Sequence, residues 1–490
     1  MGIMCKTRKL TFCLHFLRFI DIYCRFIYRL NMNQNIDVFE KYPIPKAVFK
    51  MATPTVAGMI VSVFYNMVDM FFVGQIGDPN QVAAVNIATP VFLFLMALGN
   101  IFGVGGTSFL SRALGEKNYE KVSSTSAFSF FAGLAAGILG GALLIIFMTP
   151  ILRSAGTSEN TFAFARDYLF WLSLGGPFVV LFSVYSNLIR GEGSATASMI
   201  GSMAGTITNI ILDPIFILDS FLGIPCLGLG VRGAAMATVL GNIVSVGYYL
   251  VHVIFKSQIL TINPKYLKNI KETFFGIITI GLPASLTNIL MSLSNIVINK
   301  FLVTYGDVSV AGMGIAMKAN MLVIFIQLGT GIGISPLVGY NYGSKNYKRM
   351  KGIIKFSAMC NIISGLIITA FYFVFTEQIV HMFISGDSEL VHRTIEAGIH
   401  CLRALMISAP FIGILFVLNF SFQGMGKAIP SLLLAVSRQG FVFLPAVIIL
   451  NSIMGFHGVI LAQPIADLCS IIMAICFFLF LNKEFRKAQA

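Results

Sequence analysis

The sequence predicts an all-α membrane protein in which twelve transmembrane helices form two pseudo-symmetric bundles of six. Composition is the first observation behind this prediction: 57% of the 490 residues are hydrophobic and 11% are charged. A soluble domain carries about 25% charged residues, so this chain cannot cover its surface with polar groups. The other two observations are a series of apolar runs of spanning length and an internal repeat.

The first 40 residues precede these runs and are predicted to be an N-terminal extension, possibly not native, outside the bundles. Residues 1–31 mix basic and apolar side chains and lack the uncharged segment and cleavage site of a signal peptide. Two interpretations compete. The extension is either a basic amphipathic helix on the inner membrane surface, or an upstream addition to a chain that truly starts at Met32.

Twelve apolar runs are long enough to cross a bilayer. Several exceed twenty residues, which predicts tilt or projection beyond the bilayer, and prolines within them predict bends. The predicted helices are 47–74, 83–110, 122–149, 164–189, 195–218, 233–255, 273–301, 309–340, 352–375, 394–422, 429–450 and 457–481, and the prolines are Pro54, Pro90, Pro177, Pro283, Pro336, Pro410 and Pro445.

Lys and Arg concentrate in alternate loops, as the positive-inside rule requires of a multi-pass protein of the inner (plasma) membrane. Both termini are therefore predicted to be cytoplasmic. The net charge of +14 reflects these loops and predicts no nucleic-acid partner. The predicted units are a lobe at 41–255, a basic cytoplasmic linker at 256–272, a second lobe at 273–482 and a cytoplasmic tail at 483–490.

The two lobes repeat each other in sequence. Residues 82–88 (Val-Ala-Ala-Val-Asn-Ile-Ala) match residues 310–316 (Val-Ala-Gly-Met-Gly-Ile-Ala), and at the same offset 115–119 (Gly-Glu-Lys-Asn-Tyr) match 343–347 (Gly-Ser-Lys-Asn-Tyr). Six helices per copy give both copies the same orientation. This is the parallel-repeat plan of alternating-access transporters, which places the site between the halves.

Most of the twenty acids fall in loops or at helix ends, and the clear interior ones are Asp69 and Asp213, at a similar depth in the first lobe. A charged residue there costs roughly 2.5–3.5 kcal/mol and usually serves an ion or a substrate. Asn209 lies one turn before Asp213, and Thr238 starts the next helix at similar depth. Oxygen ligands of this kind suit H⁺ or Na⁺. The alternative is that Asp69 merely caps or bonds to a neighbouring helix.

Other features were weighed for binding roles. Abundant Phe and Met predict an adaptable apolar cavity for flat cations, lined by Phe64, Tyr65, Asn66, Phe71 and Met291, although Tyr65 and Asn66 fit equally well as partners of Asp69 or as packing. In the second lobe, residues 397–426 contain no acid, so no second cation site is predicted. The basic residues within its spans could bind anionic groups or, more simply, satisfy helix ends; they are Lys318, Arg403 and Arg438.

No cofactor or metal site is predicted beyond possible Na⁺ at the acids. The glycine pattern at 228–233 fits a dinucleotide fingerprint, but no βαβ unit surrounds it. The glycines at 103–106 lack the lysine of a P-loop, and better fit close helix packing. The eight cysteines form no C-x-x-C pair and the six histidines are dispersed, so disulfide and metal frameworks are not indicated.

Several ordered motifs resemble those of the MATE (multidrug and toxic compound extrusion) family, its bacterial small-drug efflux branch above all. They cover nearly everything from Asn33 onward: 51–54 (Met-Ala-Thr-Pro), 65–74 (Tyr-Asn-Met-Val-Asp-Met-Phe-Phe-Val-Gly), 209–214 (Asn-Ile-Ile-Leu-Asp-Pro), 233–238 (Gly-Ala-Ala-Met-Ala-Thr) and 458–464 (Gly-Val-Ile-Leu-Ala-Gln-Pro). The resemblance implies two bundles around a V-shaped central cleft and cation-coupled efflux. It carries the family's cation-site residues onto Asp69, Asn209, Asp213 and Thr238, although the loop at 218–230 is longer than usual.

The sequence therefore predicts a secondary antiporter, functioning as a monomer, that exports cationic amphipathic small molecules in exchange for H⁺ or Na⁺. A flippase for a lipid-linked oligosaccharide is the alternative within transport, and the acids argue mildly against it. An intramembrane enzyme is the alternative from another class, but no nucleophile and base, or metal cluster, share one depth.

Overall fold

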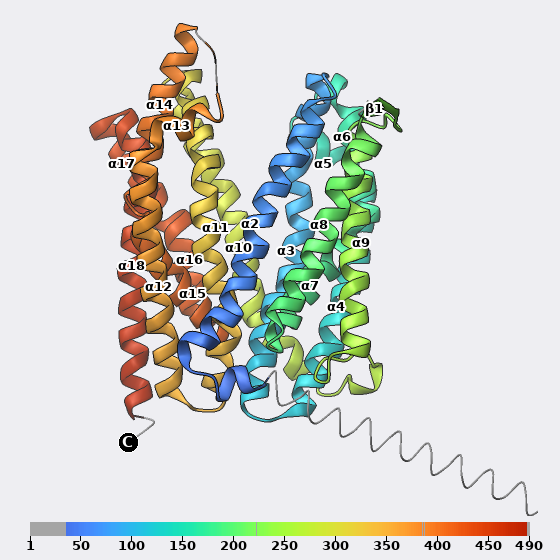
Figure 1. Cartoon of the computed structure of the whole chain (residues 1–490), viewed down its shortest axis with the longest axis vertical. Helices are drawn as coiled ribbons and strands as arrows, with labels where there is room; N and C mark the ends of the chain where they lie inside the picture. Colours follow the sequence, from blue (N-terminus) through green and yellow to red (C-terminus); the bar gives the residue numbers. More distant parts are fainter. Residues whose placement is uncertain (1–35, 222, 385, 387, 488–490) are drawn as a thin grey trace, which may run out of the picture.

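The computed structural model describes residues 36–221, 223–384, 386 and 388–487, so residues 1–35 and their two predicted alternatives lie outside the described part. Two helical bundles stand side by side in Figure 1. The first bundle, blue to green, contains α2 (Ile44–Gly74), α3 (Pro79–Gly115), α4 (Tyr119–Ile146), α5 (Met148–Ser154), α6 (Glu159–Leu174), α7 (Gly176–Gly191), α8 (Ala195–Ile217), the two-stranded antiparallel hairpin β1 (Ser220–Phe221) and β2 (Ile224–Pro225), and α9 (Val231–Phe255).

The second bundle, yellow to red, follows a short 3₁₀ helix, η1 (Pro264–Tyr266), in the connecting segment. Its helices are α10 (Ile270–Val303), α11 (Asp307–Gly343), α12 (Tyr347–Val374), α13 (Thr376–His381), α14 (Glu389–Met406), α15 (Ala409–Gly424), α16 (Ala428–Val436), the π-helical η2 (Ser437–Phe441), α17 (Phe443–Met454) and α18 (Phe456–Lys487).

The predicted fold class is confirmed. Within the described residues, ten helices are long and apolar enough to cross a membrane, and two bent pairs raise the number to twelve. These pairs are α6 with α7, bent by 54°, and α14 with α15, bent by 49°. Pro177 and Pro410 are the second residues of α7 and α15. Proline is tolerated there because the backbone N–H that it lacks would have no acceptor within the helix. Two of the predicted helices are therefore broken at their prolines.

The predicted repeat is visible as two identical turns. Lys117 and Lys345 both adopt a left-handed backbone, with φ of 60° and 58°. The next residue in each copy, Asn118 or Asn346, donates its amide to the carbonyl five residues earlier, at 2.9 Å in both. Its side chain then accepts from the amide three residues later, at 3.1 Å in both. The same sequence thus ends one helix and caps the next in each lobe.

The bundles pack together at the end that carries these two turns and separate toward the other (Figure 1). We name these the packed end and the divergent end. The contact uses α2 against α11 and α3 against α10. Glycines allow it, because a Cβ on Gly281 would lie 1.9 Å from the Ile101 carbonyl oxygen, and one on Gly105 would lie 2.2 Å from that of Ile277. Backbones that approach this closely leave no room for a side chain.

Gly281→Ala is therefore expected to lower thermal stability, by about 1–3 kcal/mol, because the new methyl group forces α10 away from α3. Gly247→Ala on α9 is the matched control, since a Cβ at Gly247 meets no atom within 4 Å. It should be neutral or slightly stabilising. Unfolding temperatures of the purified variants in one detergent compare the two directly. Equal temperatures would contradict a close contact at Gly281.

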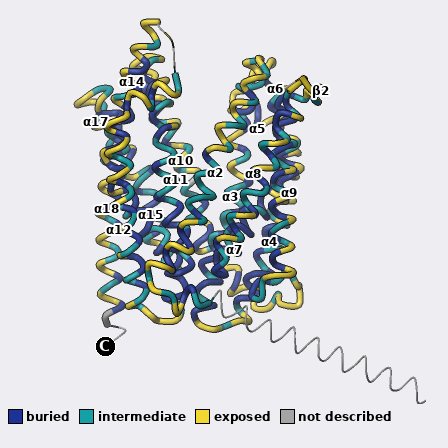
Figure 2. The backbone as a smooth tube through the Cα atoms, in the orientation of Figure 1, coloured by how far each residue is buried: buried dark blue, intermediate teal, exposed yellow. Residues whose placement is uncertain are grey.

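Burial follows the membrane expectation (Figure 2). Each bundle is buried along its interior, and a core cluster at the packed end contains residues of both lobes, among them Leu110, Tyr185, Leu337 and Phe422. Outward-facing residues remain apolar, as Ile367 (65% exposed) and Ile453 (72%) illustrate. Such side chains are stable only against lipid tails. One predicted helix differs in the structure: η2 interrupts the helix predicted at 429–450.

Candidate cation site

The candidate site lies within the first lobe, between α2, α8 and α9. The Asn209 side-chain amide on α8 donates to the Thr238 hydroxyl on α9 at 3.3 Å. The Tyr65 hydroxyl on α2 lies 3.4 Å from the same Thr238 oxygen. Asp213 stands one turn beyond Asn209, and Asp69 one turn beyond Tyr65. Three helices thus converge on one threonine.

Glycines bring α8 and α9 together just below this point. A Cβ on Gly205 would lie 2.4 Å from the Gly241 carbonyl oxygen, and one on Gly241 would lie 3.2 Å from Cβ of Asn209. The helices can therefore approach closely enough for Asn209 to reach Thr238. The longer loop at 218–230, which folds as the β1–β2 hairpin at the divergent end, does not displace Thr238.

Four oxygen atoms at this site are buried without a hydrogen-bond partner within the described part of the chain. They are Oδ1 of Asp69, both carboxylate oxygens of Asp213 and Oδ1 of Asn209. Asp213 is fully buried, and Asn209 is 3% exposed. An unpaired buried polar atom costs about 1–3 kcal/mol, and an unpaired buried charge costs more. Such a set of acceptors has the chemistry to take up a proton or a small cation.

The two carboxylates are also coupled to each other. Asp69 and Asp213 are near enough for their charges to repel. The hydroxyls of Tyr65 and Tyr168 are within electrostatic reach of both acids. Tyr168 comes from α6 and is 8% exposed. No spacing in the sequence points to Tyr168, because the bend between α6 and α7 decides which way its face turns.

The predicted cavity residues are placed differently from the predicted cation ligands. Phe64 and Phe71 on α2 are each 59% exposed, and Met291 on α10 is 47% exposed. Asn66 is also exposed, and its amide donates to the Ser62 carbonyl of its own helix at 2.8 Å. Tyr65 alone of the five contacts the cation site. A cavity lined by the other four stays a prediction.

The prediction that Asp69 and Asp213 are the interior acids was incomplete. Glu192, at the end of α7, is fully buried, and its Oε1 lies 2.7 Å from Nε2 of His252 on α9. Asp467 on α18 is 2% exposed. Glu192 stands next to a predicted basic loop and Asp467 is surrounded by apolar residues, so a signal existed only for Asp467. It lies three residues after Pro464, deep within a predicted span.

Asp467 accounts for Arg438, one of three basic residues predicted inside the second lobe. Arg438 Nε donates to Asp467 Oδ1 at 2.8 Å, and Gln463 donates to the same oxygen at 2.9 Å. The Ser408 hydroxyl donates to Oδ2 at 3.0 Å. Both carboxylate oxygens are therefore satisfied, in contrast to those of Asp213. The guanidinium also lies 5.3 Å from the Phe416 ring centroid, which places Arg438 in the structural role. Lys318 and Arg403 are exposed.

Comparisons with known proteins agree with this geometry. The MatE family model matches residues 54–215 and 283–449, one match in each lobe. A multidrug export protein, MepA, of Staphylococcus saprophyticus is 31% identical over 448 residues, which are 91% of this chain and 96% of that protein. MepA of Staphylococcus aureus strain MRSA252 is 32% identical over 450 residues, with the same coverage of both chains.

A solved structure with the same architecture is described as the outward-facing conformation of a multidrug resistance MATE family transporter of the MOP superfamily. It superposes with a TM-score of 0.85 at 25% identity, over 92% of this chain and 99% of that one. Two lobes of six spans with an acidic site in the first define a multi-pass membrane transporter. This chain belongs to the MATE family, and the resemblance found in the sequence is confirmed.

Proposed function

We propose that this protein is a secondary antiporter of the plasma membrane that exports cationic amphipathic compounds in exchange for H⁺ or Na⁺. The observation that carries the proposal is the group of four unpaired buried oxygens on Asp69, Asn209 and Asp213. Relatives named as multidrug export proteins support export as the direction of transport and drugs as the kind of cargo.

The exchange follows from competition for negative charge. Ionised Asp69 and Asp213 repel each other and attract a positive charge. A proton or Na⁺ that binds Asp213 cancels its charge and weakens this attraction, which favours release of a cationic compound held near Asp69. Asp69 suits the exchange because it is half-buried, whereas Asp213 is fully buried. Ion binding must also favour one arrangement of the lobes by a few kcal/mol if it is to drive the cycle.

The basic loops give the proposal its orientation. The turns with Lys117 and Lys345 lie at the packed end, where α18 also ends (Figure 1). By the positive-inside rule we propose that this end is cytoplasmic, as the sequence predicts for both chain termini. The site would then be reached from outside through the divergent end, consistent with the outward-facing relative. We further propose that one chain suffices, because both lobes and the site are contained in it.

Transport in proteoliposomes tests the proposal. Purified protein should move ethidium against its own gradient when a proton or Na⁺ gradient is imposed, and should stop when that gradient is collapsed. Imposing the two gradients separately identifies the coupling ion. Ethidium transport that ignores both gradients would contradict coupling at the acids. Movement of a fluorescent lipid-linked sugar, with no ethidium transport, would favour the flippase alternative.

A further inference from the structure

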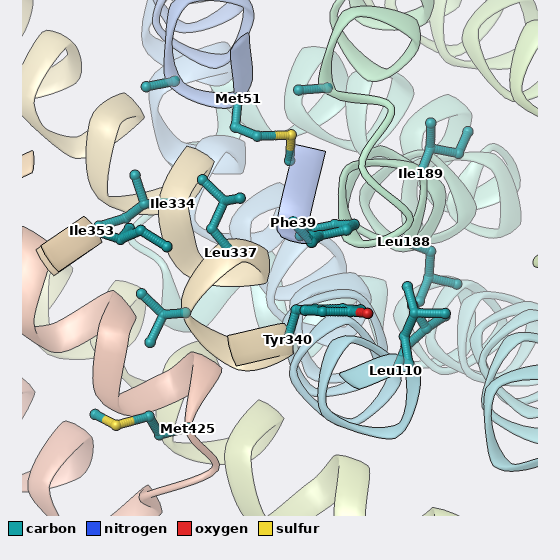
Figure 3. Packing of buried hydrophobic residues seen from close by; sticks show 14 of the residues in the cluster. Phe39, Met51, Leu110, Leu188, Ile189, Ile334, Leu337, Tyr340, Ile353 and Met425 are labelled. Carbon is teal, nitrogen blue, oxygen red and sulfur yellow. The ribbon is translucent and has the colours of Figure 1, made fainter. Parts of the chain in front are cut away.

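Val38 and Phe39 form a buried plug between the lobes at the packed end, although they precede the first spanning helix. Val38 and Phe39 have no exposed surface. The Phe39 ring stacks on that of Tyr340 in α11, with centroids 4.9 Å apart and planes 11° apart. Phe39 belongs to a core cluster with Leu110 and Ile189 of the first lobe and Leu337 of the second, and Figure 3 shows it among them. It therefore fills space that both lobes share.

The second lobe holds this segment by its backbone. Arg349 on α12 donates from Nε to the Phe39 carbonyl at 2.8 Å and from Nη2 to the Val38 carbonyl at 3.4 Å. Asn341 on α11 donates to the Phe39 carbonyl at 3.4 Å. These carbonyls lie at the end of the helix at residues 36–40, where no following helical turn supplies an N–H to donate to them. Arg349 thus anchors the segment to the second lobe.

Glu40 joins the segment to the turns of both repeats. Its Oε1 accepts from the Tyr340 hydroxyl at 2.5 Å and lies 4.0 Å from Nζ of Lys117 in the first lobe. Glu40 also lines a cavity of about 570 Å³ whose other walls are residues 115–117, 340–341 and 343–346. The turns that the repeat places in equivalent positions therefore face each other across Glu40.

The lobes are in direct contact around this segment. A Cβ on Gly115 would lie 2.1 Å from the Tyr340 carbonyl oxygen, and one on Gly343 would lie 2.2 Å from that of Arg112. Opening the packed end requires these backbones to separate. Tyr340 and Arg349 would then move with the second lobe, while Leu110 and Ile189 would move with the first. Phe39 cannot keep both sets of contacts.

We propose that residues 38–40 act as an interlobe wedge that holds the packed end shut and must leave Tyr340 and Arg349 before that end opens. The inference rests on the proposed function, because only an alternating-access cycle opens the packed end. Removing the Phe39 ring or its Arg349 anchor shifts the equilibrium toward an opened packed end. The wedge is thereby one of the determinants of which face of the transporter is open.

A buried cysteine reports this opening without a transport assay. Ser111 on α3 is fully buried, and its Oγ would lie 2.3 Å from a Cβ on Gly339 of α11, so it is covered by the opposite lobe. Ser111→Cys in full-length protein whose eight native cysteines are replaced gives one labelling site. Its rate of reaction with a water-soluble maleimide measures how often the packed end opens.

Phe39→Ala and Arg349→Ala should each increase the labelling rate of the Ser111→Cys protein by roughly tenfold or more, the change that a small loss of contact energy between the lobes produces. Phe255→Ala and Arg393→Ala are the matched controls, since Phe255 is 77% exposed and the Arg393 side chain 68% exposed. Both controls should label at the parent rate. A folding check by size-exclusion chromatography precedes each measurement.

Unchanged labelling in a folded Arg349→Ala variant would overturn the wedge, even if Phe39→Ala fails to fold. Acceleration in Phe39→Ala alone would overturn it too, because the anchor would then be irrelevant. The wedge and the proposed function fail separately. Faster labelling in protein that transports no ethidium would leave the wedge standing and refute the exporter, whereas coupled transport with unchanged labelling would do the reverse.

Discussion

Asp213→Asn should reduce ion-coupled export to the level of empty liposomes while leaving the protein folded. The substitution keeps the size of the side chain and removes its charge. An amide takes up no proton at physiological pH and carries no negative charge to attract Na⁺, so the ion can no longer compete effectively with the cargo. Asp213 is fully buried with both oxygens unpaired, so the substitution removes the negative charge from this buried position. Ethidium transport under an imposed gradient measures the loss.

Asp213→Asn should also be more stable than the parent protein, although it loses transport. A buried carboxylate without donors is a cost that the folded state bears for function, and Asn lowers it by about 1–3 kcal/mol. The gain should be larger at alkaline pH, where the carboxylate of the parent protein is ionised, and smaller in acid, where protonation has already removed the charge. Thermal unfolding of both proteins across pH measures this difference.

Asp167→Asn provides the matched control. Asp167 lies on α6 toward the divergent end and is exposed, so its charge is solvated in the parent protein. This variant should transport at the parent rate and unfold at the parent temperature. Full transport by Asp213→Asn, or equal losses in both variants, would refute the assignment of Asp213 as the ion-binding carboxylate.

Asp467→Asn should destabilise the protein by about 3–5 kcal/mol, because it leaves the buried guanidinium of Arg438 without its counter-charge. The side chains of Arg438 and Asp467 are only 13% and 4% exposed, so solvent screens the pair weakly. The pair also ties two irregular points of the second lobe, the π-helical η2 and the bend at Ser408, to the long helix α18. Unfolding temperatures in detergent report the loss.

The double variant Arg438→Met with Asp467→Leu should recover most of this stability, since apolar residues of similar size replace buried pairs well. Glu389→Gln is the control for an exposed pair. Glu389 and Arg393 lie 2.5 Å apart with side chains 79% and 68% exposed, so this variant should lose less than about 1 kcal/mol. If Asp467→Asn keeps its stability and alters drug selectivity, Arg438 binds anionic groups instead.

The grouping of the candidate cation-site residues was predictable because its signals are local. Asp69 and Asp213 interrupt long apolar runs, and the helical period places Asn209 on the face of Asp213. The structure brings these residues and Thr238 together as predicted, and adds Tyr65 by a hydrogen bond and Tyr168 by proximity. Tyr168 was not predictable, since its direction depends on a bend between two helices rather than on any motif around it.

The second lobe shows the other limit. Arg438 and Asp467 are 29 residues apart, on different helices, and each reads alone as a charge in an apolar run. Their pairing gives Arg438 a structural role. Glu192 and His252 form a second buried contact between distant residues. Sequence marks a charge as unusual, but only packing decides whether another side chain neutralises it.

By itself, the sequence determined the twelve spans, the repeat, the family and the four polar residues of the candidate cation site, because hydropathy, helical period and motif spacing are properties of neighbouring residues. Only the tertiary structure decided which acids remain unpaired and that Phe39, within a segment predicted to lie outside the bundles, is buried between the lobes. Both depend on contacts between residues far apart in the chain, where small differences in helix direction determine what each side chain meets.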